Sequence, residues 1–150
     1  MPHGLHCYWK SDYLGELSDE AIEILVRHAW QASSPRSYTI MFQLGGAIRR
    51  VGDDDTAFED RRALHALNII NAVWSDALES DQHIRWARDF WEAIHPVSNG
   101  GVYVNFLGNE GEERVRAAYG AAKYARLVAL KNQYDPTNLF CLNQNIKPTV

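Results

Sequence analysis

The sequence predicts an α+β fold in which an antiparallel sheet carries helices packed on one face. Segments rich in β-branched and aromatic residues occur among segments whose apolar residues recur at i, i+3, i+4 and i+7. Strands and helices alternate irregularly with short links, which favours an antiparallel sheet. The 150 residues, 46% of them hydrophobic, are enough for one sizeable core, so we expect a single domain over residues 1–150.

The N-terminal part is expected to form a short strand over 5–10 and then a helix. Ser18 suits the N-cap of that helix, because its hydroxyl can accept a backbone N–H of the first turn. Asp19 and Glu20 follow, and their charges favour the positive end of a helix. We expect the helix to end near Trp30 and to bury one stripe of apolar residues: Ile22, Leu25, Val26 and Ala29.

Two further strands are expected in the middle of the chain. The segment 38–44 is β-branched and aromatic, and Gly45 and Gly46 after it permit a bend or bulge. The run 62–74 begins with residues that also permit a helix. Its second half, 69–74, has strong strand character, so we interpret the run as a strand.

The second half of the chain is expected to contain three helices and one strand. A helix over 81–95 is ended by Pro96, and its broad apolar face predicts burial. The alternation in 102–106 predicts a strand that points Tyr103 and Asn105 to one side. Helices over 110–119 and 121–132 follow, separated by Gly120.

Composition and charge exclude several classes of function. The net charge of −4, without any cluster of Lys or Arg, argues against nucleic-acid and membrane partners. No stretch approaches the ~20 apolar residues of a membrane span, and the first residues do not resemble a secretory signal. We therefore expect a cytoplasmic protein with Cys7 and Cys141 as free thiols and no metal site.

The C-terminal tail is the most distinctive segment. Asp135 and Pro136 predict a turn that stops the preceding helix. Leu139, Phe140 and Leu142 are expected to be buried beyond that turn. Three consecutive amides, Asn143, Gln144 and Asn145, then indicate that something polar receives the end of the chain.

The last helix and the tail together carry a dense, ordered motif. It reads Tyr124-Ala125-Arg126-Leu127, Lys131, Tyr134-Asp135-Pro136-Thr137-Asn138-Leu139-Phe140, Asn143-Gln144-Asn145-Ile146 and Pro148. This motif resembles the C-terminal motif of the berberine-bridge-enzyme-like flavoproteins, which are FAD-linked oxidases of the vanillyl-alcohol-oxidase type. The resemblance continues upstream at Trp9-Lys10-Ser11, Leu44-Gly45-Gly46-Ala47, Thr56-Ala57-Phe58 with Arg61 or Arg62, Trp74, and Tyr103-Val104-Asn105-Phe106.

This resemblance covers nearly the whole chain, from about residue 5 to the end. It implies the second half of the family's substrate domain, with the berberine-like region over about 100–148. The FAD-binding domain that normally precedes this part is expected to be absent. No GxGxxG or other glycine-rich phosphate cradle occurs in the sequence, so we do not expect this chain alone to bind FAD tightly.

The resemblance also implies roles for five residues. Tyr103 would be the catalytic base that takes a hydroxyl proton while hydride leaves for the flavin. A tyrosine base must lower its pKa from about 10, with help from a positive charge or a second tyrosine. Asn105 would bind substrate, and Asn143, Gln144 and Asn145 would approach the FAD. Each also has a structural alternative, as a strand residue or as an amide that fixes the tail.

The predicted function is therefore the substrate-domain portion of an FAD-dependent oxidoreductase that moves hydride from an alcohol or amine carbon to flavin, with reoxidation by oxygen. Such a chain would be inactive alone or would complete a separate FAD-binding domain. The alternative is a non-enzymatic, homo-oligomeric module that binds small molecules or another protein. Exposed strand edges and apolar faces left by a missing half would favour a second copy as partner.

Overall fold

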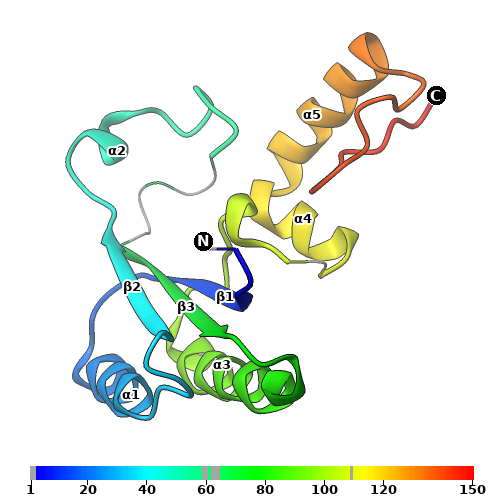
Figure 1. Cartoon of the computed structure of the whole chain (residues 1–150). Coiled ribbons are helices and arrows are strands. Elements are labelled where there is room, and N and C mark those ends of the chain that lie inside the picture. Colours follow the sequence, from blue (N-terminus) through cyan, green and yellow to red (C-terminus); the bar gives the residue numbers. More distant parts are fainter. Residues whose placement is uncertain (1–2, 59–60, 62–64, 109) are drawn as a thin grey trace.

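The chain folds around a three-stranded antiparallel sheet with the order β1-β3-β2 (Figure 1). The computed structural model describes residues 3–58, 61, 65–108 and 110–150. The strands are β1 (His6–Leu14), β2 (Tyr38–Gln43) and β3 (Ala66–Trp74). All nine residues of β3 are buried, as suits a central strand, and the predicted strand is confirmed over this part. Residues 62–64 of that prediction lie outside the described residues.

Two long helices cover one face of the sheet, which confirms the predicted fold class. Helices α1 (Asp19–Trp30) and α3 (Ser80–Ile94) pack against each other and on this face (Figure 1). Ser18 caps α1 as expected, because its Oγ accepts the N–H of Ala21. The main core lies between these two layers: Leu14, Ala21, Leu25, Ile70, Ala72, Trp74, Trp86, Ala87, Phe90 and Ile94.

The predicted stripe of α1 is wrong for three of its four residues, because Ile22, Val26 and Ala29 are exposed. Leu25 is buried together with Ala21, but Ile22 and Val26 are about half exposed. The buried side of the helix is therefore rotated toward Ala21, a residue too small to dominate the hydrophobic pattern. Trp30 is also exposed, unlike Trp74 and Trp86.

Two further helices lie on the opposite side of the sheet (Figure 1). Helices α4 (Glu112–Tyr119) and α5 (Ala121–Tyr134) meet at Gly120, whose φ of 69° suits a glycine. They enclose a small core with Val102 and Leu107. Between the main elements lie four short helical segments: α2 (Ala47–Arg50), η1 (Ala77–Glu79), η2 (His95–Val97) and η3 (Val104–Phe106).

The predicted strand over 102–106 is wrong. Phe106 donates its N–H to the carbonyl of Tyr103 at 2.8 Å, and the segment closes into the 3₁₀ turn η3. Val102 and Val104 pack toward α4 and α5, whereas Tyr103 and Phe106 pack toward the sheet. The side chains of this segment pack into two different cores. A straight strand, whose side chains alternate strictly between two faces, cannot direct both Tyr103 and Phe106 to the same core.

The tail turns as predicted but does not bury its apolar residues. The carboxylate of Asp135 accepts the N–H groups of Leu139 and Phe140 and pairs with Lys131. Leu139, Phe140 and Leu142 are 75, 77 and 83% exposed. The expectation that they supply buried surface is therefore wrong for the chain by itself.

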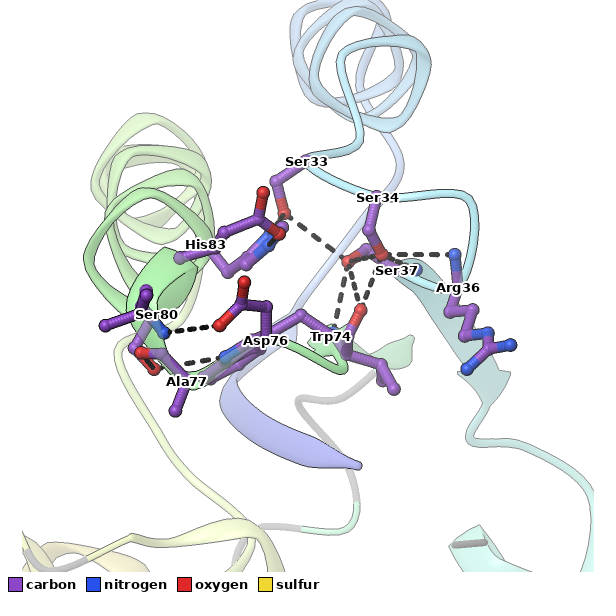
Figure 2. Close-up of polar contacts among 12 residues, drawn as sticks. Ser33, Ser34, Arg36, Ser37, Trp74, Asp76, Ala77, Ser80 and His83 are labelled. Atoms are coloured by element: carbon purple, nitrogen blue, oxygen red, sulfur yellow. Dashed lines mark hydrogen bonds and ion pairs between the residues drawn. The ribbon is translucent and has the colours of Figure 1, made fainter. Parts of the chain in front are cut away.

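A serine-rich loop joins α1 to β2, and hydrogen bonds attach this loop to the end of β3 (Figure 2). Ser34 and Ser37 bond to each other and to the backbone of Val73. Ser33 Oγ lies 2.9 Å from Nδ1 of the buried His83, whose ring stacks on Trp74. These contacts fix the positions of α1, α3 and β3 relative to one another, so we assign the cluster a structural role.

The pair of Asp12 and His95 gives stability a pH dependence of definite sign. Asp12 is fully buried, and its Oδ2 lies 2.5 Å from Nδ1 of His95. Burial raises the pKa of Asp12 above 3.8 and outweighs the contacts with His95 and Ser98, which lower it. The native chain thus holds this proton more tightly than the unfolded chain, so the contribution of Asp12 to the free energy of unfolding falls as the pH rises above 3.8.

We expect Asp12→Asn to remove this decrease, which urea unfolding between about pH 2.5 and pH 7 would measure. Asp135→Asn is the control with the opposite sign. The bond from Lys131 lowers the pKa of Asp135, so its stabilisation is present above 3.8 and is lost as the pH falls. An Asp12→Asn variant with the same pH dependence as the wild type would contradict this assignment.

Candidate active site on the open face of the sheet

The face of the sheet opposite α1 and α3, here called the open face, carries a cluster of aromatic residues. Tyr13, Leu67 and Ile69 point to this face from β1 and β3 and are buried. Phe58, Tyr103 and Phe106 pack on them from loops far away in the sequence. Two strands and two further segments of the chain therefore meet at one place on the sheet.

Tyr103 and Asn105 are brought together as predicted, although by a turn and not by a strand. Asn105 Nδ2 donates to the Tyr103 hydroxyl at 2.9 Å. The amide can keep donating to this oxygen after the phenol has lost its proton. A phenol with a fixed amide donor is a group suited to proton transfer.

Phe58 is the centre of the aromatic cluster. Its ring lies 5.4 Å from the ring of Tyr103 and 6.2 Å from that of Tyr13. The guanidinium of Arg61 lies over the same ring at 4.7 Å. The buried Lys123 of α5 donates to the Phe58 carbonyl at 3.0 Å. The loop that carries Phe58 is thus attached to both the sheet and α5.

The other two tyrosines near Tyr103 are held in the neutral form. Burial raises the pKa of Tyr13, the nearby Tyr103 raises it further, and Arg61 opposes both effects. Burial and then Tyr103 also raise the pKa of Tyr119. These two phenols therefore do not compete as proton acceptors at neutral pH. Arg61 lies over the Phe58 ring that packs on Tyr103, and Tyr13 belongs to the same cluster.

Among the described residues, no hydrogen bond joins Tyr103 to any of the three tail amides. The three amides also differ in their exposure and in their hydrogen bonds. Gln144 Nε2 donates to the carbonyls of Leu107 and Gly108 at 2.9 and 3.3 Å, which is a structural contact. Asn143 is exposed and has a φ of 57°. Asn145 Oδ1 is buried without a hydrogen-bond partner among the described residues. Asn143 and Asn145 thus have polar groups left for another molecule.

Two negative findings apply to the described residues. No three His, Cys, Asp or Glu side chains in that part of the chain lie close enough to hold a metal ion. Within the same residues, no helix combines the length and the apolar composition that crossing a membrane requires.

Comparison with known proteins agrees with this architecture. The sequence profile described as "Berberine and berberine like" matches residues 102–147. The FAD-linked oxidoreductase YvdP of Bacillus subtilis is 30% identical over 141 residues, which are 94% of this chain and 30% of that protein. Tetrahydroberberine oxidase of Berberis wilsoniae is 28% identical, over 93% of this chain and 29% of its own.

Solved structures show the same fold. The berberine bridge enzyme of Eschscholzia californica superposes with a TM-score of 0.81 at 21% identity, over 95% of this chain and 33% of that one. Curated relatives that the chain matches over most of its length are FAD-linked oxidoreductases. More particularly, the chain belongs to the berberine-bridge-enzyme-like family. The chain spans about 30% of the length of the curated relatives.

Proposed function

We propose that this chain supplies the substrate side of an FAD-dependent oxidoreductase that removes hydride from an alcohol or amine carbon. The hydrogen bond between Asn105 and Tyr103, set in the aromatic cluster of the open face, is the observation that carries the proposal. Tyr103 would accept the substrate proton, and Asn105 would orient the phenol and the substrate hydroxyl or amine. An FAD held beside these residues would supply the acceptor for the hydride, with oxygen as the final electron acceptor.

The residues of the chain fit one edge of a flavin but not a whole FAD molecule. Asn143 and the unpaired Asn145 Oδ1 can donate to and accept from the polar edge of an isoalloxazine. Gln144 holds the tail in place for them. We propose that a separate FAD-binding domain holds the rest of the cofactor, so that the chain alone is inactive.

The shape of the tail supports such a partner. The turn around Asp135 is fixed by Lys131, which also donates to the carbonyl of Phe140 at 2.7 Å. Asn132 adds two bonds to Thr149 at 2.8 and 2.9 Å. A rigid turn that exposes three large apolar side chains is suited to docking, because little conformational entropy is lost on binding.

A second candidate function follows from the exposed edge of β2. Tyr38, Ile40, Met41 and Phe42 are all exposed, and β2 is an edge strand without charge or proline. Such an edge can pair with a second copy of the chain. This edge favours the non-enzymatic, homo-oligomeric module. We propose, as a separate point from the sequence, that the protein acts in the cytoplasm. Light scattering that finds a well-folded monomer at micromolar concentration would count against this candidate.

Visible absorbance of the purified chain, before and after addition of FAD, is the first test. We expect a colourless protein that retains no FAD. A flavin band that co-purifies would support an enzyme but contradict the proposed need for a separate FAD-binding domain.

Restoration of activity is the second test. A relative's flavin domain, made without its own C-terminal region, should regain oxygen consumption when this chain is added. Phe140→Asp should abolish the effect, whereas Leu78→Asp, which changes an even more exposed apolar residue in η1, should not. No regained activity with any alcohol or amine tested would favour the non-enzymatic module.

A further inference from the structure

The open face carries a second set of polar residues that the proposed proton transfer does not use. Opposite residues form rows across the sheet, and Tyr38, Asn71 and Trp9 form one such row over β2, β3 and β1. The row that contains Tyr13 lies four residues further along β1, which is about 13 Å at ~3.3 Å per residue. The Ser11 row lies halfway between them.

Three polar atoms in this region have no hydrogen-bond partner among the described residues: Trp9 Nε1, Ser11 Oγ and Asn71 Oδ1. Ser11 is 2% exposed and Asn71 is 8% exposed. The Asn71 amide is held in position, because its Nδ2 donates to the Tyr38 hydroxyl at 2.8 Å. A buried polar group without a partner costs about 1–3 kcal/mol, so native structures keep few of them. Three on adjacent rows of one face therefore indicate a partner from outside the chain.

The chemistry of the three atoms defines what this partner is. The indole N–H donates, the amide oxygen accepts, and the hydroxyl can do both. None of the three side chains is charged, and the same holds for Tyr38. A neutral group that both donates and accepts, such as a hydroxyl or a primary amide, satisfies all of them. A groove of about 460 Å³ lies beside Trp9, and its lining also includes the charged Lys10, Arg88 and Glu110.

We propose that Trp9, Ser11 and Asn71 form a binding subsite for a neutral hydroxyl or amide group of the ligand. The identification of that ligand with the substrate rests on the proposed function. The substrate is then an extended molecule that reaches from the cluster of Tyr13 and Tyr103 to rows about 7–13 Å further along β1. A compact ligand would leave the three atoms unpaired.

Nuclear magnetic resonance of the ¹⁵N-labelled full chain tests the subsite with acetamide as the probe. Five tryptophans give five indole N–H signals, and Trp9→Phe identifies the signal of Trp9. We expect a saturable shift of this signal on addition of acetamide. The indoles of Trp74 and Trp86 already donate to Ser80 and His28, so their signals should not move. Trp91 has an unpaired indole N–H outside the row and is the matched control.

N,N-dimethylacetamide can accept a hydrogen bond but cannot donate one to Asn71. It should bind about 10-fold more weakly than acetamide, as loss of one hydrogen bond predicts. Asn71→Leu should remove the difference between the two amides. If that variant does not fold, Ser11→Ala should still weaken the binding of both amides. Equal affinity for both amides in the wild type, an equal shift at Trp91, or no saturation would overturn the proposal. This readout needs neither flavin nor turnover, so failure of the proposed oxidase function would be seen separately.

Discussion

Replacing Tyr103 by Phe is expected to lower the turnover of the reconstituted oxidase by a factor of about 10²–10⁴, the usual contribution of a general base. The substitution keeps the ring that packs against Phe58 and Phe106 and removes only the hydroxyl. The thermal unfolding midpoint should therefore change little. Oxygen consumption per bound flavin, measured with saturating substrate, gives the turnover.

Tyr119→Phe is the matched control for this prediction. Tyr119 is close enough for Tyr103 to raise its pKa, but burial already keeps it neutral. Its hydroxyl should therefore contribute little to turnover. Normal turnover in Tyr103→Phe would remove Tyr103 from the mechanism, and equal losses in both variants would indicate a general disturbance of the site.

Replacing Phe90 by Ala is expected to lower the free energy of unfolding by about 3–5 kcal/mol. Phe90 is completely buried in the core between the sheet and the two long helices. Its ring packs against Trp86 and stacks on His28 of α1 at 5.0 Å. The substitution leaves a cavity at the contact between α1 and α3, which chemical denaturation would detect.

Trp30→Ala provides the comparison for this prediction. Trp30 is a larger residue in α1, but it is 86% exposed. Its loss should change stability by no more than about 0.5 kcal/mol. A loss in Phe90→Ala below about 1 kcal/mol would show that the core between the helices is not packed as described.

The sequence allowed the helices and the central strand to be predicted because their signals are local. Ser18 caps α1 through a bond within the first turn, and Pro96 follows the end of α3. The strand character of 69–74 reflects burial on both faces of β3. These features need no information about distant parts of the chain.

The errors arose where tertiary packing outweighs local preference. The 102–106 segment has the composition of a strand. It turns after Tyr103 because its side chains pack into two separate cores. Leu139 and Phe140 have the character of core residues, yet no described element packs over them. Their exposure gives the proposed docking surface its physical basis.

The candidate site was predictable only in part. The motif around Tyr103 pointed to Tyr103 and Asn105, and the structure shows that their side chains meet. Tyr13 and Lys123 were missed, because nothing in their local sequence distinguishes a strand tyrosine or a helical lysine. Their roles depend on contacts with Phe58 across 45 and 65 residues of chain.

Co-elution of this chain with a flavin domain that lacks its own C-terminal region tests the central claim most directly. Size-exclusion chromatography with light scattering and visible absorbance would follow both chains and the flavin. We predict a one-to-one complex that carries the flavin band, and its loss in Phe140→Asp. A flavin domain that elutes without this chain at micromolar concentrations of both would contradict the claim that these residues complete a flavoenzyme.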